Sequence, residues 1–344
     1  MQQKLKDILK SKGISNNKID DVIASGYTIR RFGSPFGGQV SDFINDQMYG
    51  NKQPSGIFDI DTFVEYIQGK NSFDRAHPFP TYNVKNIDEI NEVLSVPKRA
   101  HYIKEGRMSF RGQTSEYMFK RKVPNPIRSD DNGYELSIFP GIYRQKEEYY
   151  SFDKPINEKK TFQHVLRDLE PNNPDIYYDS PYSHDIMRVE QHYASHTHGL
   201  DIAFDIETAI FFSTHKLKFN QDNKASYEKV EKGSHKGVIY GFCFREPTVN
   251  KTEFLIKDFS LFKTYPPERI LRQDCGLPLI LEYERNIAIT DLDFIMYLDD
   301  EFDYEGIKDP LYMFPNIKED KFYKKLLELK IKYPEELGNV VEYI

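Results

Sequence analysis

A chain of 344 residues is long enough to bury a sizeable core, and it predicts one large domain with a smaller appended module. The formal net charge of -7 gives no bulk attraction to nucleic acid, and 2 cysteines are too few for a disulfide framework or a four-thiolate zinc site. The sequence lacks the run of roughly 18 apolar residues that spans a bilayer, and its start lacks the apolar core of a signal peptide. We therefore expect a cytoplasmic protein without a membrane partner.

Residues 1–82 are predicted to form an appended helical module. Its apolar residues recur at helical spacing, and glycines follow at positions that suit helix C-caps. The module either covers one face of the main domain or binds independently. Four helices are expected, in chain order: one around Leu5–Leu9 that stops at Gly13, one through Ile19–Ile23 that ends at Gly26, and two over Val40–Met48 and Asp61–Ile67.

Residues 83–320 are predicted to form the main domain, in which helices and strands follow one another without regular alternation. This order favours an α+β fold, a central mixed or antiparallel sheet with flanking helices, over a doubly wound sheet. The charged stretch 216–236 is expected to be a surface loop. Helices are predicted at Asp88–Leu94 and Thr161–Leu169, and strands at Met108–Gln113, Ala209–Phe212, Gly237–Phe244, Leu277–Tyr283 and Ile287–Ile289.

Residues 321–344 are predicted to dock a helix onto this domain. Phe322, Leu326 and Leu329 recur at helical spacing within Asp320–Tyr333, and Pro334 closes the run.

The stretch from Gln191 to Ser213 sets polar groups directly against an apolar run. His192, His196 and His198 are three of the 9 histidines in the chain. Such crowding of titratable side chains beside a buried segment predicts a rigidly held polar cluster at the edge of a pocket.

Three landmarks in chain order resemble the FRG domain of bacterial proteins, which is named for its Phe/Tyr-Arg-Gly tripeptide. They are FRGQ at 110–113, QHY at 191–193 with Thr197 and Leu200-Asp201 at fixed offsets, and RILRQDCG at 269–276. Pro140 with Tyr143-Arg144 resembles the family's Pro-Ser-Leu-Phe-Arg segment. Five positions depart from the family pattern, which indicates a diverged member: Ala194, His198, Ile202, Ile206 and Asn316.

Arg111 follows an apolar strand and precedes Gly112, so its guanidinium is expected to be held rigidly while the backbone beside it leaves room for a ligand. The planar fork of arginine suits phosphate or carboxylate. The alternative is structural, with Arg111 paired to a core carboxylate such as Asp201.

The chain order also resembles ADP-ribosyltransferases of the Arg-Ser-Glu type, with Arg111, then Phe212-Ser213-Thr214, then Glu282-Tyr283-Glu284. The resemblance implies NAD as substrate: Arg111 would hold the pyrophosphate, His192 the nicotinamide ribose, and Glu284 would activate a protein or nucleic-acid acceptor. It also implies a toxin or antiphage role. A Glu-x-Glu among 54 acidic residues arises by chance as well. The predicted nucleotide-binding residues are Arg111, Gly112, Gln113, His192, Thr197 and Ser213.

A neutral His192 can donate to a ribose hydroxyl and exchange a proton near neutral pH. It can equally be a structural histidine bonded to Asp201 or to a backbone carbonyl. In the pocket, Thr197 and Asp201 would orient His192. Gln273 is expected to be a buried amide that fixes a loop.

Two other function classes stay open. His192 and His196 stand four residues apart, near Asp201 and Asp205, and such a pair on a helix can share a divalent metal in a hydrolase or nuclease. Gly199 argues against a continuous helix there, and the family pattern supplies only the first histidine. The other class is a pocket that binds a nucleotide signal without catalysis.

Overall fold

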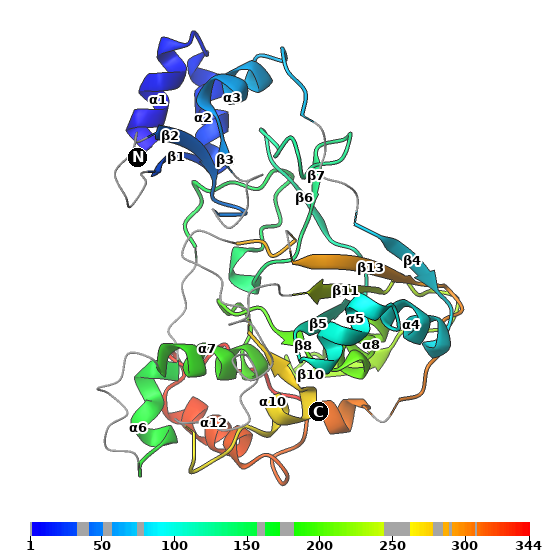
Figure 1. Cartoon of the computed structure of the whole chain (residues 1–344). Coiled ribbons are helices and arrows are strands. Elements are labelled where there is room, and N and C mark those ends of the chain that lie inside the picture. Colours follow the sequence, from blue (N-terminus) through cyan, green and yellow to red (C-terminus); the bar gives the residue numbers. More distant parts are fainter. Residues whose placement is uncertain are drawn as a thin grey trace.

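The computed structural model describes residues 2–32, 41–50, 57–73, 79–156, 162–172, 182–243, 262–277, 285–288, 291–306 and 308–344. The fold is α+β, as predicted, and a six-stranded sheet forms its centre (Figure 1). The strands lie in the order β12-β8-β5-β11-β13-β4. Their bounds are β4 Thr81–Val84, β5 Met108–Gln113, β8 Ile202–Ala203, β11 Val238–Cys243, β12 Cys275–Gly276 and β13 Leu292–Leu298.

The central sheet is mixed, because β4 runs parallel to β13 while the other neighbours are antiparallel. Strand β11 is buried along its whole length and sends alternate side chains into two cores. Ile239 and Cys243 pack with residues of helices α4 (Ile87–Leu94) and α8 (Ile206–Thr214), while Val238, Tyr240 and Phe242 join the core on the other side. The predicted helix at 88–94 and the strand at 108–113 are confirmed, and the strand predicted at 237–244 is confirmed over Val238–Cys243.

The prediction of a strand over 209–212 is wrong, because these residues lie inside α8. Asp205 caps that helix by accepting from the backbone amides of Glu207 and Thr208. A short apolar run suits a buried helix as well as a buried strand, and the cap decides between them.

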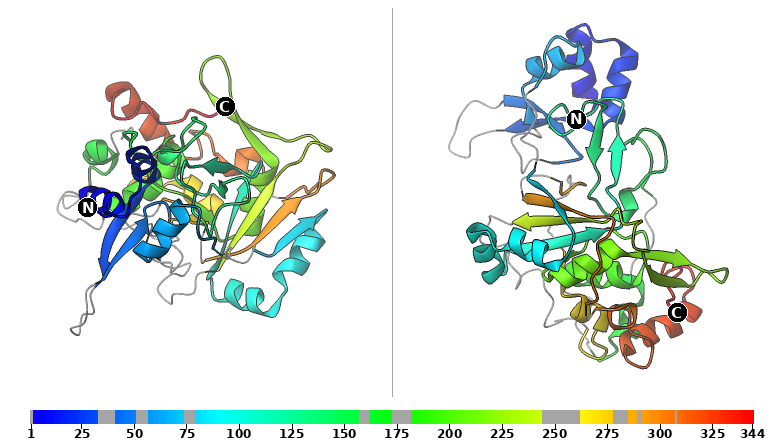
Figure 2. Two further views of the ribbon diagram at one scale, coloured as in Figure 1. Left: turned by 90° about the horizontal axis from the view of Figure 1, so that it is seen from above. Right: turned by 90° about the vertical axis from the view of Figure 1, so that its right-hand side faces the viewer.

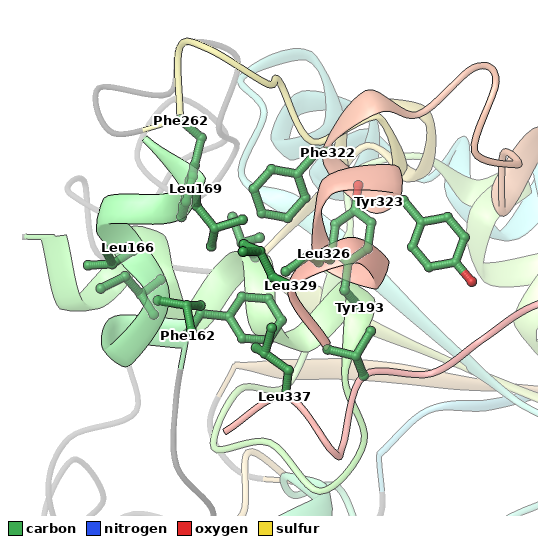
Figure 3. Close-up of a cluster of buried hydrophobic side chains, with 14 of the residues drawn as sticks. Phe162, Leu166, Leu169, Tyr193, Phe262, Phe322, Tyr323, Leu326, Leu329 and Leu337 are labelled. Carbon is green, nitrogen blue, oxygen red and sulfur yellow. The ribbon is translucent and has the colours of Figure 1, made fainter. Parts of the chain in front are cut away.

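A helical layer built from α6 (Leu166–Leu169), α7 (Tyr182–Tyr193) and α12 (Lys321–Lys332) lies at one end of the molecule (Figure 1). Phe322, Leu326 and Leu329 of α12 are buried against α6, α7 and the short helix η3 (Phe162–Val165), as Figure 3 shows. This confirms the predicted C-terminal helix. None of the helices in the described ranges is both long and apolar enough to cross a membrane.

The N-terminal elements gather around a core of their own at the opposite end (Figure 1 and the right view of Figure 2). Helices α1 (Gln2–Ser11), α2 (Asn16–Ala24) and α3 (Ile60–Ile67) match three of the four predicted helices. The fourth is wrong. Residues 41–46 form strand β2 (Ser41–Asp46), which pairs antiparallel with β1 (Tyr27–Phe32) and with β3 (Ile57–Phe58).

A buried ionic cluster joins these N-terminal elements to the hairpin of β6 (Met118–Lys120) and β7 (Tyr134–Leu136). The Arg121 guanidinium lies 2.8 Å from carboxylate oxygens of both Asp46 and Glu135, and all three side chains are fully buried. Arg121 also donates to the Ser25 carbonyl oxygen at 2.8 Å. A buried charge requires such partners, so the two parts are held together by charge as well as by apolar packing.

The charged stretch 216–236, predicted as a loop, contains most of a hairpin of β9 (His215–Phe219) and β10 (Ala225–Lys229). The hairpin projects beside the C-terminus, yellow-green in Figure 2. Of the predicted strands at 277–283 and 287–289, residues 278–283 and 289 lie outside the described ranges, and residues 287 and 288 form no strand. Four short helices complete the described elements: α5 Pro97–Lys104, η2 Gly141–Tyr143, α10 Glu268–Gln273 and α11 Pro310–Met313.

Candidate functional site

The three sequence landmarks converge on one cavity of about 280 Å³. Phe110–Gly112 from β5, Gln191-His192 from the end of α7, and Gln273 with Cys275 all line it. Phe219 from β9 and Tyr343 near the C-terminus close the wall. The prediction that Arg111 and His192 meet at one pocket, although 81 positions separate them in the chain, agrees with this geometry.

The cavity opens where the central sheet loses a strand. Strand β8 pairs with β5 only through Phe110 and Ala203, so no described strand covers that side of β5 from Arg111 onward. On its other side, β5 stays paired with β11 as far as Gln113. The result is a rigid strand with one open flank, and Arg111 stands at the start of that flank.

Arg111 is paired with Asp201 and still borders the cavity. Its Nη1 atom donates to Asp201 Oδ1 at 2.9 Å and to the Asp201 carbonyl oxygen at 2.7 Å. The two side chains keep 13% and 16% of their surface exposed, so the pair is not sealed off. Burial raises the pKa of the Asp201 carboxyl, but the opposing effects of Arg111 and His192 outweigh it and leave the pKa lowered. The carboxylate therefore remains charged, and it neutralises only part of the cationic wall.

A second guanidinium, that of Arg144, stands beside the first. Arg144 lines the cavity, is exposed, and makes no hydrogen bond or ion pair with a described side chain. Desolvation by the surrounding protein, and next the charge of Arg111, lower the pKa of Arg144. The guanidinium nevertheless keeps its proton, as arginines in proteins do. Two like charges held close together favour an anion between them. The sequence signal for Arg144 was its place in the Pro-Ser-Leu-Phe-Arg-like segment.

Hydrogen bonds determine which nitrogen of His192 carries the proton. Gln273 donates its Nε2 to the Met313 carbonyl oxygen at 3.0 Å, so its Oε1 faces His192 Nδ1 at 2.9 Å. Because Oε1 only accepts, Nδ1 carries the hydrogen and Nε2 keeps a lone pair. Burial lowers the pKa of the imidazole, which favours its neutral form. Gln273 is thus buried, as predicted, and it also orients a cavity residue, which the sequence did not indicate.

Thr197 lines the cavity and donates its hydroxyl to Gln191 Oε1. The Nε2 atom of Gln191 in turn donates to Asp201 Oδ1 at 3.0 Å. A short chain of hydrogen bonds therefore runs from Thr197 through Gln191 to the carboxylate that holds Arg111.

Three other predicted site residues have different surroundings. Gly112 borders the cavity, but a Cβ atom there would lie 1.8 Å from the Ala209 carbonyl oxygen, so the space beside it belongs to helix α8 and not to a ligand. Gln113 and Ser213 are buried and do not line the cavity; the Ser213 hydroxyl donates to the Ile210 carbonyl oxygen within α8. Glu284 lies outside the described residues.

The histidines do not form the helical metal pair that was considered. Helix α7 ends at Tyr193, and His196 has a left-handed backbone with φ of 57°. Across the described ranges, no three side chains of His, Cys, Asp or Glu lie close enough to hold an ion.

Aromatic side chains form a wall of the same cavity: Phe212, Phe219, Tyr227, Phe314 and Tyr343. Phe314 stacks on Tyr227 with ring centroids 4.5 Å apart, and on Tyr343 at 4.7 Å. Phe219 adds a ring that is 51% exposed, and Phe212 packs edge-on against Tyr227. Such flat, partly exposed faces suit the stacking of a planar heterocycle. The wall has no local signal in the sequence, because its five rings come from five separate parts of the chain.

Arg269, from the third landmark, holds this wall from behind. Its guanidinium is fully buried and lies 4.6 Å from the ring centroid of Tyr193, 4.0 Å from that of Tyr323 and 4.5 Å from that of Tyr343. Cation–π contacts replace most of the hydrogen bonds that a buried guanidinium needs. The segment that carries Tyr343 is thereby fixed against α7 and α12.

Two curated proteins match this chain distantly. They are the dITP/XTP pyrophosphatases of Borrelia recurrentis (strain A1) and Borrelia duttonii (strain Ly), each 26% identical over 189 residues. The matched region covers 47% of this chain and 92% of each relative. No family model matches the chain, and no solved structure gives a significant match.

Proposed function

We propose that this cavity binds a nucleotide, with phosphate oxygens between Arg111 and Arg144 and the base against the aromatic wall. One observation carries the proposal: two guanidiniums and an imidazole nitrogen with a free lone pair border one cavity that also has an aromatic side. Guanidinium groups recognise phosphate oxygens, and aromatic side chains stack on nucleobases of every type. The distant match to nucleotide pyrophosphatases supports this ligand class.

The activity that we propose first is hydrolysis of a phosphoanhydride bond in the bound nucleotide. A water oxygen attacks phosphorus, its proton passes to His192 Nε2, and the bond to the bridging oxygen breaks with its electron pair leaving on the departing phosphate. Arg111 and Arg144 stabilise the charge that develops on the phosphate oxygens. Gln273 keeps the acceptor nitrogen of His192 available to the cavity.

NAD consumption is the second candidate, and the presence of Arg111 and His192 on one cavity favours it. In that scheme Arg111 grips the pyrophosphate and His192 contacts the nicotinamide ribose, as the resemblance to ADP-ribosyltransferases implies. Ser213 does not support the scheme, because its hydroxyl is bonded inside α8. Membership of the FRG family stays a prediction, and so does a sensor role in which the nucleotide binds without reacting.

One set of assays separates these functions. The purified chain is incubated with Mg²⁺ and, in turn, dITP, XTP, ATP or NAD, and the release of phosphate, diphosphate and nicotinamide is measured alongside binding. We expect phosphate or diphosphate release that falls at least about a hundredfold in His192→Asn, the loss typical of a removed general base. His101→Asn is the control, because His101 lies exposed on α5 away from the cavity.

Each outcome of these assays assigns one function. Binding without turnover would support a sensor, and nicotinamide release would support NAD consumption. Absence of binding for every nucleotide would overturn the proposal.

A further inference from the structure

A second cavity, of about 320 Å³, adjoins the first and shares Arg144 with it. The hairpin of β6 and β7, together with residues 144–150, forms most of its wall. The hairpin lies between the N-terminal elements and the central sheet (Figure 1 and the right view of Figure 2). Arg144 also borders a third hollow, of about 310 Å³, which Lys146 and Arg285 help to line. The first and second hollows are similar in size. Each is near the lower end, about 300 Å³, of the usual range for small-molecule sites, so either alone suits one ring system with its sugar.

The second cavity is also aromatic and partly exposed. Tyr117 and Tyr134 keep 47% and 44% of their surface exposed, and Met118 beside them keeps 41%. Phe139 and Tyr150 form its buried floor. Three large exposed side chains on one short hairpin exceed what folding requires, and such patches mark binding sites.

Positive charge concentrates where the two cavities meet. Arg111 and Arg144 border the first cavity, and the charges of Arg144 and Lys216 both act on the hydroxyl of Tyr117, which lines the second. Burial alone would raise the pKa of Tyr117, but its hydrogen bonds to Ser115 and Thr114 and these two cations lower it. An anion placed at this junction would meet the guanidinium of Arg144 and the nearby charge of Arg111.

The nearby carboxylates leave that junction open. Asp201 is held by Arg111, Glu116 accepts from the Tyr297 hydroxyl at 2.7 Å, and Glu147 is paired with Lys154. Glu148 lies on the second cavity's rim, so a phosphate is favoured only on the Arg144 side. The net charge of -7 argues against a long polyanion as ligand.

We infer that the ligand is a dinucleotide, whose pyrophosphate link lies at Arg144 and whose second ring system stacks in the cavity of Tyr117 and Tyr134. This inference rests on the proposed nucleotide binding at the first cavity and extends it. Two kinds of molecule carry two heterocycles joined through phosphate: a free pyrophosphate-linked dinucleotide and the end of a nucleic-acid strand. The geometry favours the free dinucleotide because the two hollows meet at one cationic point.

Calorimetric titration of the purified chain tests the inference with four probes: ADP, diadenosine diphosphate, NAD and the phosphodiester-linked dinucleotide pdApdA. We expect a pyrophosphate-linked dinucleotide to bind at least about tenfold tighter than ADP. Tyr134→Ala should weaken that dinucleotide about 5- to 100-fold, the effect of losing one base stack, while ADP affinity stays within about twofold. Tyr312→Ala is the matched control, because Tyr312 is exposed on α11 and lines neither cavity.

The outcomes separate the two proposals. If ADP binds but neither pyrophosphate-linked dinucleotide gains affinity, the second subsite is overturned and the first cavity stands. If pdApdA binds tightest, the pyrophosphate link is overturned in favour of a strand end. If Tyr134→Ala weakens ADP and dinucleotide equally, the two cavities do not act as separate subsites. If no nucleotide binds, the proposed function itself fails.

Discussion

His192 Nδ1 lies 2.9 Å from Gln273 Oε1, and the amide is locked in that orientation by its own 3.0 Å bond to the Met313 carbonyl oxygen. A side chain 81 positions away thus decides which imidazole nitrogen can take a proton. Because burial lowers the pKa of His192 below its usual 6.5, the neutral form is present at pH 7 and is lost only below that value.

Gln273→Leu should slow nucleotide hydrolysis at least about tenfold, because it leaves Nδ1 without an acceptor and no longer fixes the tautomer. In the wild type, kcat/KM should fall on the acid side of pH 6.5. Gln273 raises the pKa of His192, so the acid limb should move to lower pH in the variant. A rate loss without any shift of that limb would indicate damage to packing instead.

Glu190 gives the stability of the fold a dependence on pH. Its carboxyl is buried, and burial raises its pKa to about 7, from about 4.5 in the unfolded chain. Between these two values the folded state holds a proton that the unfolded state has released, so stability falls as pH rises from about 4.5 to 7. Glu190→Gln should lack this decline.

The comparison is made by urea unfolding of Glu190→Gln and wild type at several pH values. The difference between the two free energies of unfolding should grow by roughly 3 kcal/mol over that interval and then level off. A difference that stays constant with pH would contradict the assigned pKa.

A substitution at Gly112 tests the close contact between β5 and α8. Gly112→Ala would bring a Cβ to 1.8 Å from the Ala209 carbonyl oxygen, so strand and helix must separate, at a cost of at least about 1–3 kcal/mol. At Gly141 the nearest atom to an added Cβ is His196 Cα at 3.6 Å, an ordinary contact. Gly141→Ala should therefore change the free energy of unfolding by less than about 0.5 kcal/mol. Equal losses of unfolding free energy in the two variants would contradict this explanation.

Replacement of Arg121 should lower the stability of the fold far more than replacement of Lys122, the next residue in the chain. Arg121→Met leaves the buried Asp46 and Glu135 carboxylates without their cation, and we expect a loss of about 3–5 kcal/mol in unfolding free energy. Lys122→Met removes only an exposed ion pair with Asp21 and should cost less than about 1 kcal/mol. Similar thermal midpoints for the two variants would mean that the buried cluster does not hold the N-terminal elements.

The sequence predicted the α+β class and the meeting of Arg111 with His192, because those residues sit next to elements with strong apolar patterns. It failed over residues 41–46, where the strand is defined by pairing with β1 and by the burial of Asp46 against Arg121. Neither partner is visible in a local window. At 209–212 the N-cap at Asp205 outweighed β-prone residues.

The candidate site was predictable only where a motif marked it. Gln273 was expected to fix a loop, and its effect on His192 depends on a contact between distant parts of the chain. The aromatic wall has the same origin, since Phe219, Tyr227, Phe314 and Tyr343 approach one another only in three dimensions. Long-range contacts of this kind leave no periodic signal in the sequence.

Tyr343 and Val341 belong to the same cavity wall as Arg111, so the pocket unites positions separated by more than two hundred residues. During translation, the segments around β5 and α7 emerge from the ribosome well before residues 341 and 343 do. A nascent chain halted before them can fold much of its sheet, yet its aromatic wall lacks Tyr343. Ligand competence should therefore arise only after residue 343 has been synthesised.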